Sequence, residues 1–226
     1  MNEVSPRVMV AGLLTAGWAV AQAPWYVGGG AGISTLSGDA RSDITATLTA
    51  VSQYKPENGP LGHLFAGKHV HEYLSVQGVY SWNRNALALL STSVTSAGFE
   101  ATYEPARRSR QHNAAADALI YFRGRTSAVR PFLSVGLDAM RFATTATELR
   151  VLKGAANPPV PHWTATRAGL RVAAGMDWMP RGGSWGVRYA FLETIQGNPI
   201  SPRLFPPGRR GLANFQNLFG VVKYFR

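Results

Sequence analysis

The sequence has 226 residues, enough for a single domain with one sizeable core or one closed barrel. It has no cysteine, which excludes disulfide bonds, thiolate metal sites and a cysteine nucleophile. The 23 Lys and Arg against 12 Asp and Glu give a formal net charge of +11, which suits an anionic partner but does not by itself separate nucleic acid from an anionic lipid.

The N-terminal segment has the pattern of an export signal. Arg7 precedes an apolar run over residues 8–20, and the small residues Ala21 and Ala23 then form a signal-peptidase pattern. We therefore expect a signal peptide at 1–23 and one exported domain at 24–226; the alternative is a retained N-terminal helix. No other stretch has the ~20 apolar residues of a membrane helix, so any membrane span must consist of strands.

Eight segments with a two-residue period follow the expected cleavage site. They lie at 25–34, 61–70, 74–82, 113–123, 131–143, 165–178, 185–196 and 214–225. In the third segment Leu74, Val76 and Tyr80 share one face, whereas Ser75 and Gln77 lie on the other. An apolar outer face with a small or polar inner face is typical of a membrane barrel, while a soluble barrel such as a lipocalin places its apolar face inside. The lipocalin-like ligand-binding barrel is the alternative fold.

The connections between these segments alternate in length. Those at 35–60, 83–112, 144–164 and 197–213 hold 26, 30, 21 and 17 residues, whereas those at 71–73, 124–130 and 179–184 hold only 3, 7 and 6. Long and short connections therefore fall at opposite ends of the strands, as in membrane barrels with extracellular loops and periplasmic turns. The sequence thus predicts an all-β fold, an eight-stranded antiparallel up-and-down transmembrane β-barrel preceded by a signal peptide.

Five tryptophans fall at the predicted strand ends, where the membrane interfaces should lie. An amphipathic ring prefers the headgroup level, so we expect these residues to form aromatic girdles. They are Trp25, Trp82, Trp163, Trp178 and Trp185.

Three stretches resemble the small outer-membrane β-barrel proteins of the OmpA-like and OmpX-like type. Phe65-Ala66-Gly67-Lys68 followed by Glu72-Tyr73-Leu74-Ser75-Val76-Gln77-Gly78-Val79-Tyr80 is similar to their second hairpin, and Val129-Arg130-Pro131-Phe132 is similar to the start of their fifth strand. Gly220-Val221-Val222-Lys223-Tyr224-Phe225-Arg226 resembles their C-terminal strand. The resemblance implies export to the periplasm, insertion into the outer membrane of a Gram-negative bacterium by the barrel-assembly machinery, and a monomer in contact with outer-membrane lipid.

The inner faces of the predicted strands carry charges of both signs. The interior of an eight-stranded barrel is just wide enough for side chains to fill, so charges inside it must be paired. We expect a lumen charge network and no open channel, with a narrow pore as the alternative. Its members are Asp117, Asp138, Arg171, Asp177 and Arg188.

Arginines cluster in two of the long connections. Guanidinium groups suit the phosphates of lipopolysaccharide, which gives the hypothesis of glycolipid contacts; the alternative is an unspecific solvated surface. The candidates are Arg107, Arg108, Arg110, Arg203, Arg209 and Arg210.

No motif assigns a catalytic, cofactor or metal site. His63, His69 and His71 share parity but have no acidic cluster beside them, so we expect no metal. His112 and His162 near Ser109 leave a lipid A-modifying enzyme as the alternative function. A nucleic-acid partner is not expected, because export would separate the protein from nucleic acid. The leading expectation is a structural or surface-interaction role carried by four long extracellular loops.

Overall fold

The computed structural model describes residues 25–37, 44–45, 48–95, 100–153, 162–180, 183–199 and 211–225, and all regular elements in these ranges are β-strands. None of the described segments is a helix with the length and hydropathy of a membrane span. The expected signal peptide at 1–23 lies outside the described residues.

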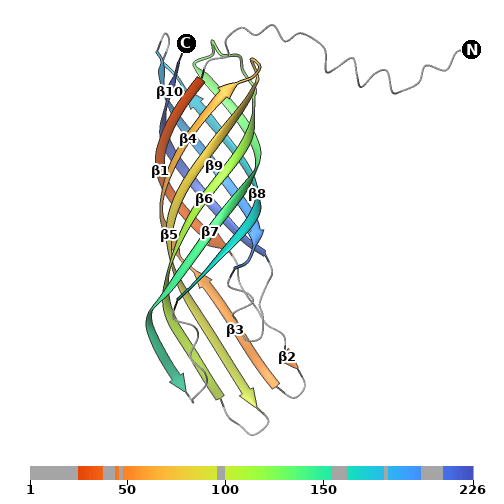
Figure 1. Cartoon of the computed structure of the whole chain (residues 1–226), viewed down its shortest axis with the longest axis vertical. Coiled ribbons are helices and arrows are strands. Elements are labelled where there is room, and N and C mark those ends of the chain that lie inside the picture. The colour runs from red at the N-terminus through yellow and green to blue at the C-terminus, as the bar shows by residue number, and fades with distance from the viewer. Residues whose placement is uncertain are drawn as a thin grey trace, which may run out of the picture.

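Eight of the strands form a closed antiparallel barrel (Figure 1). Around the wall they are β1 (Trp25–Ser37), β4 (Asn58–His69), β5 (Leu74–Thr95), β6 (Glu100–Tyr121), β7 (Val129–Lys153), β8 (His162–Trp178), β9 (Trp185–Gly197) and β10 (Gly211–Tyr224). Each pairs with its neighbour along the chain, and β10 closes the barrel by pairing with β1 from Tyr26↔Tyr224 to Ser37↔Ala213. Closure leaves no unpaired barrel edge in lipid. The predicted eight-stranded up-and-down barrel is confirmed.

The start of β1, the end of β10 and the three short connections lie at one end of the barrel (Figure 1). This end is tied together by backbone hydrogen bonds from Phe225 N to Trp25 O at 2.7 Å and from Tyr224 N to Ser184 O at 2.8 Å. The turns between β4 and β5, β6 and β7, and β8 and β9 follow the strand boundaries expected from the sequence to within a few residues. We call this end the turn end.

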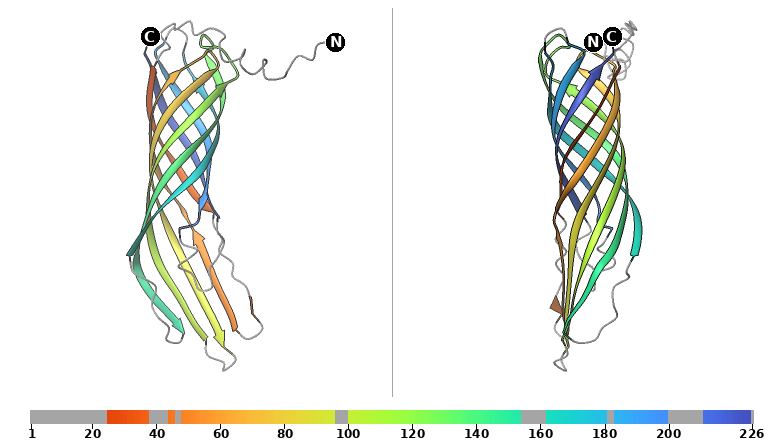
Figure 2. Two further views of the ribbon diagram at one scale, coloured as in Figure 1. Left: turned by 45° about the vertical axis from the view of Figure 1, so that its right-hand side comes forward. Right: turned by 90° about the vertical axis from the view of Figure 1, so that its left-hand side faces the viewer.

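At the opposite end, four strands continue past the barrel as a paired sheet (Figures 1 and 2). β5 and β6 have 22 residues each and β7 has 25, about twice the 9–11 that a tilted strand needs to cross a bilayer. β3 (Leu48–Pro56) adds the fourth strand by pairing with β5, and β2 (Ile44–Thr45) pairs with β3. We call the part of this sheet formed by β3 and the outer halves of β5–β7 the strand extension.

The strand extension corrects the expectation that 35–60, 83–112 and 144–164 are mainly loops. Within 83–112 every described residue belongs to β5 or β6, which pair out to Val94↔Glu100. Strand length was inferred from bilayer thickness, but a strand can continue in water for as long as a neighbour supplies its hydrogen bonds. The β-branched residues Thr92, Val94 and Thr95 carried a signal for this continuation.

Two irregularities accompany the change from barrel to extension. β3 and β4 act as one long strand interrupted at Glu57, whose backbone N donates to Ala86 O at 3.0 Å. The β6–β7 pairing shifts register between Thr102 and Tyr103 and again between Ala106 and Arg107, beside Pro105. Proline and β-bulges are typical of strand ends and bends, where the ladder need not be continuous.

The wall has an apolar outer face. The side chains that alternate outward remain exposed although they are large and hydrophobic, which suits lipid and not water. A lipocalin-like barrel would bury the same residues, so that alternative is wrong. They include Trp25, Val27, Ile33, Leu64, Leu74, Val76, Tyr80, Leu133, Val135, Leu137, Leu170, Val172, Met176, Val187, Phe191, Ile195, Phe219 and Val221.

The inner face is mixed, which corrects the expectation of a small or polar inner face. Buried apolar side chains form three clusters inside the barrel, one of which contains Tyr26, Phe65, Val79, Val222 and Tyr224 near the turn end. The other two contain Leu61, Leu119, Tyr121, Phe132, Ala190 and Leu218, and Leu36, Leu87, Met140, Phe142 and Leu212. Polar and charged side chains are therefore packed between layers of apolar ones.

Candidate functional site

All five predicted lumen charges are buried inside the barrel. Asp117, Asp138, Arg171, Asp177 and Arg188 are each at most 5 % exposed. Their strands bring them inward because each lies on the face opposite the lipid-facing residues of its strand.

Asp177 and Arg188 form the tightest contact. They are directly opposed in the β8–β9 pairing, and the guanidinium donates two hydrogen bonds, from Nε to Asp177 Oδ1 at 2.6 Å and from Nη2 to Asp177 Oδ2 at 2.7 Å. Asp177 Oδ2 also accepts the hydroxyls of Tyr224 at 2.6 Å and Tyr121 at 3.1 Å. This fork geometry is the strong form of an Arg–carboxylate pair, and here it joins β6, β8, β9 and β10 across the lumen.

Arg188 can extend into the lumen because its neighbours on the other side are glycines. Gly220 is its partner on β10, and Gly30 is the next residue in register on β1. The guanidinium lies 4.4 Å from the ring centroid of Phe65 and 5.0 Å from that of Phe132, so aromatic faces cover the charge where hydrogen bonds do not.

Gln77 connects this pair to a second one. Arg188 Nη1 donates to Gln77 Oε1 at 3.0 Å, and Gln77 Nε2 donates to Asp117 Oδ2 at 3.1 Å. Asp117 Oδ2 lies 3.2 Å from Arg171 Nε in an ion pair. One amide thus bridges two buried ion pairs, and four of the five predicted charges belong to one connected network.

The Asp117–Arg171 pair depends on a glycine between its partners. Asp117 on β6 is opposite Gly136 on β7, which is opposite Arg171 on β8. A Cβ at Gly136 would collide with Asp117 Oδ1 and with the backbone oxygen of Ala116. Arg171 therefore reaches Asp117 across β7, the intervening strand, which has no side chain at that position.

Asp138 is near enough to Arg171 and Asp117 for their charges to interact, but it is not joined to this network by a hydrogen bond. Neither of its carboxylate oxygens has a hydrogen-bond partner among the described residues, although the side chain is buried. Its register partner Gly169 again leaves the space that the carboxylate fills.

Sequence reasoning missed several members of the lumen. Arg130 is 1 % exposed, its Nη1 lies 3.3 Å from His69 Nε2, and its guanidinium lies 4.0 Å from the ring centroid of Tyr121. Gln77 was placed on the inner face but not recognised as a bridge, and the tyrosines were not identified. Parity carried a signal for Arg130, because it is eight residues before Asp138 on the same strand, but the partners come from distant strands.

A second, uncharged network lies on the other side of the Asp117–Arg171 pair. Ser34 Oγ donates to Asn214 Oδ1 at 2.7 Å, and Asn83 Nδ2 donates to Ser34 Oγ at 3.1 Å. Asn85 Nδ2 donates to Glu57 O at 2.9 Å and to Ser34 O at 3.0 Å. Asn85 therefore satisfies the carbonyl at the β3–β4 interruption, where the barrel passes into the strand extension.

The six arginines proposed for glycolipid contact do not form one set. Arg108 and Arg110 are exposed on the outer face of β6, whereas Arg107 is 2 % exposed on the inner face. Placing Arg107 outward was wrong, because it shares the parity of Asp117, ten residues later on the same strand. Arg203, Arg209 and Arg210 lie outside the described residues.

The predicted girdle tryptophans are described in four of five cases. Trp25, Trp178 and Trp185 are each more than half exposed at the turn end, at 58 %, 51 % and 55 %. Lys68 Nζ lies 5.3 Å from the Trp25 ring centroid and Lys223 Nζ lies 5.0 Å from that of Trp185. Trp82 is half-buried on the outer face of β5. The side chain of Trp163 lies outside the described part of the structure.

The histidines do not lie on one side of the barrel wall. His63 and His69 are buried in the lumen while His71 is exposed in the β4–β5 turn, and no cluster of metal-ligating residues is present in the described part of the chain. Ser109 is also buried inside and donates to Asn85 O at 3.0 Å, whereas His112 and His162 face outward. Ser109 therefore cannot pair with either histidine as a nucleophile and base.

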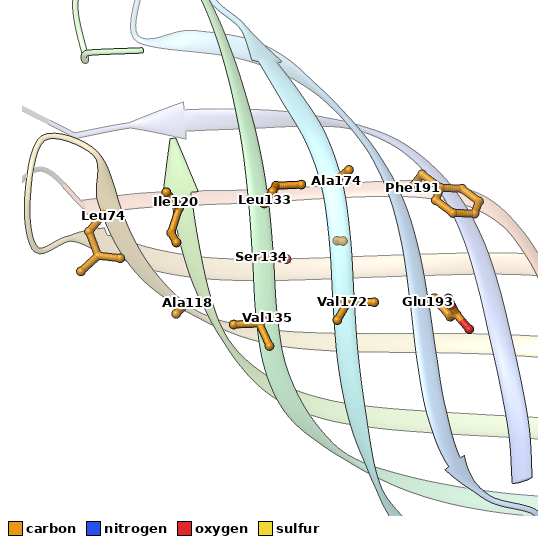
Figure 3. Close-up of a pocket in the computed structure, with 11 residues that line it drawn as sticks. Leu74, Ala118, Ile120, Leu133, Ser134, Val135, Val172, Ala174, Phe191 and Glu193 are labelled. Carbon is orange, nitrogen blue, oxygen red and sulfur yellow. The ribbon is translucent and has the colours of Figure 1, made fainter. Parts of the chain in front are cut away.

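The outer wall has a shallow apolar hollow of about 520 Å³ across β5–β9 (Figure 3). Small side chains at Ala118 and Ala174 lower the surface between larger neighbours such as Ile120, Leu133 and Phe191. Glu193 stands at its edge and is half-buried. The lining suits an acyl chain, as expected of a lipid-facing wall.

Comparison with solved structures supports the architecture. The barrel is similar to the neisserial surface protein NspA, with a TM-score of 0.53, 14 % identity, and coverage of 89 % of this chain and 97 % of that one. It is also similar to the outer membrane protein OprG from Pseudomonas aeruginosa, with a TM-score of 0.53, 12 % identity, and coverage of 90 % and 96 %. At these identities the likeness concerns the fold. No curated protein matches the sequence.

A family profile gives the assignment that fold similarity alone cannot. The outer membrane protein beta-barrel domain matches residues 8–199, most of the chain, and implies an outer-membrane location. The apolar outer wall, the closed strand order and the packed lumen agree with that match. The chain therefore belongs to the outer membrane protein beta-barrel domain family.

Proposed function

We propose that this chain is a closed outer-membrane anchor that displays the strand extension at the cell surface for interaction with other molecules. The observation that carries the proposal is the length of β5, β6 and β7, which continue as paired strands well beyond the bilayer requirement. Paired backbone gives the extension a defined shape, which an unpaired loop lacks. A binding surface on such a sheet therefore loses little conformational entropy when it binds a partner.

The filled lumen supports an anchoring role over transport. Two ion pairs and Gln77 cross the interior, and aromatic rings cover Arg188 on several sides. A water path would have to displace side chains that hold one another by hydrogen bonds.

Surface display predicts an asymmetric labelling pattern. Because the protein has no cysteine, single introduced thiols can report exposure on intact cells. Ser93→Cys in the strand extension should react with a membrane-impermeant maleimide on intact cells. Thr126→Cys, in the exposed β6–β7 turn, should react only after the outer membrane is permeabilised. Labelling of Thr126→Cys alone on intact cells would reverse the orientation and end the display proposal.

The closed lumen predicts that the purified barrel gives no steady open-channel current in planar bilayers. A 16-stranded porin in the same lipid serves as the positive control, because barrels of that size leave an aqueous channel. Insertion is verified separately by protease protection. A steady ohmic current from the inserted barrel would favour the narrow-pore alternative and count against the anchor.

A further inference from the structure

Outward-facing arginines gather where the barrel wall passes into the strand extension. Arg84 on β5, and Arg108 and Arg110 on β6, line a groove of about 630 Å³ together with Asn58, Thr145 and His162. The three arginines are exposed. Arg84 and Arg110 share one register row, and Arg108, Thr145 and His162 share another. With Asn58 on β4, the groove crosses the five neighbouring strands β4–β8.

Two of these arginines are placed against each other. Arg84 is directly opposite Arg110 in the β5–β6 pairing, and Arg108 is two residues along on the same face, opposite Ala86. Like charges directly opposite on one sheet face are destabilising. Among the described side chains the printed ion pairs, Arg171–Asp117 and Arg188–Asp177, lie inside the barrel and include none of these three arginines. Three exposed guanidinium groups on adjacent strands favour an anionic ligand.

The height of the groove indicates where that anion comes from. Arg84 is ten residues after Leu74, the first residue of β5, which is about 33 Å along a strand and, at the usual tilt, about 25 Å along the barrel axis. That equals the height of the apolar band of a membrane barrel. The Arg84 guanidinium also lies 5.4 Å from the ring centroid of Trp82, a predicted girdle residue. The groove therefore lies at headgroup level, one hydrophobic thickness from the turn end.

We infer that this groove binds a phosphate group on the headgroup of an outer-leaflet glycolipid. Arg84 and Arg110 would hold the phosphate oxygens between them, since paired guanidiniums offer several N–H donors in fixed planes. Arg108 and the Thr145–His162 pair, whose Oγ1 and Nδ1 are 3.1 Å apart, lie on the adjacent row and provide further polar contacts. The inference rests on the proposed function only for the membrane setting and orientation.

The test measures lipid retention by the purified, refolded full barrel in zwitterionic detergent. Bisphosphorylated lipid A, dephosphorylated lipid A and inorganic phosphate are titrated separately, and bound lipid is counted by native mass spectrometry. Wild type should bind the phosphorylated lipid at least about tenfold more tightly than the dephosphorylated one. The double variant Arg84→Gln, Arg110→Gln should lose about tenfold or more of that affinity, because it removes both guanidinium groups that would hold the phosphate oxygens by charge-assisted hydrogen bonds.

Controls separate loss of binding from loss of folding or of general charge. Arg123→Gln combined with Lys68→Gln removes the same charge at the turn end and should leave affinity unchanged. In detergent without lipid A, the Arg84 and Arg110 variant should be as stable as wild type or more stable, since it relieves like-charge repulsion. If that variant does not fold, Arg108→Gln alone should still weaken binding measurably.

Three results would overturn the inference. They are equal affinity for phosphorylated and dephosphorylated lipid A, equal loss in the turn-end control, and inorganic phosphate binding that accounts for all the affinity. Surface labelling of Ser93→Cys would still succeed in each case, so a failure here is distinguishable from a failure of the display proposal.

Discussion

Replacing Asp177 with alanine is expected to destabilise the folded barrel by about 3–5 kcal/mol, the usual effect of removing one partner of a buried ion pair. The change leaves Arg188 buried at 5 % exposure without the carboxylate that accepts two of its hydrogen bonds. It also removes the acceptor of Tyr121 and Tyr224. The measurement is reversible urea unfolding in lipid vesicles, followed by tryptophan fluorescence.

A double variant tests whether the loss comes from the uncompensated charge. Asp177→Leu combined with Arg188→Met removes both charges and fills part of their volume, so it should be clearly more stable than Asp177→Ala. If the double variant is as unstable as the sum of its single changes, the pair is not coupled. A loss below about 1 kcal/mol for Asp177→Ala would show that water replaces the carboxylate and that the lumen is not dry.

Replacing Gly136 with valine is expected to destabilise the barrel by about 3 kcal/mol or more, or to prevent insertion. The new side chain would enter the space that Asp117 occupies and would meet the backbone of Ala116, which cannot move without breaking the β6–β7 ladder. Overpacking alone costs about 1–3 kcal/mol, and displacement of Asp117 would in addition leave Arg171 unpaired. Urea unfolding of the refolded variant measures the total.

The chain offers a matched control for this change. Gly78 lies on the lipid-facing side of β5, and a Cβ there meets nothing within 4 Å. Gly78→Val adds the same atoms to the same kind of strand but in lipid, so its stability should equal or slightly exceed that of wild type. Similar losses at both positions would mean that glycine is needed for the backbone and not for the Asp117–Arg171 pair.

We expect the inward and outward residues of the barrel to affect different properties of the protein. The buried network at Asp177 and Arg188 holds the barrel closed near the turn end. The uncharged network around Asn85 ties the barrel to the interruption at Glu57, where the extension starts. Changes in the first should alter stability, whereas changes to outward residues such as Arg84 and Arg110 should alter lipid binding and leave the fold intact.

The sequence by itself determined the number of barrel strands and the outward face of those with the clearest alternation, such as 74–82 and 165–178. These follow from a two-residue period, which assigns every residue of a strand to lipid or to the lumen without knowledge of its neighbours. The same period placed Asp117, Asp138, Arg171, Asp177 and Arg188 inside, and it would have placed Arg107 inside had it been applied through the expected loop.

Only the tertiary structure decided which lumen residues meet and how far the strands continue. Parity says which face a side chain occupies but not the register between strands. The bridge through Gln77 and the Asp117–Arg171 contact across Gly136 could therefore not be predicted. A strand can continue beyond the bilayer only where a neighbouring strand continues beside it. The extension is therefore a joint property of β3, β5, β6 and β7, which no single segment reveals. The opposed arginines Arg84 and Arg110, 26 residues apart in the sequence, became neighbours for the same reason.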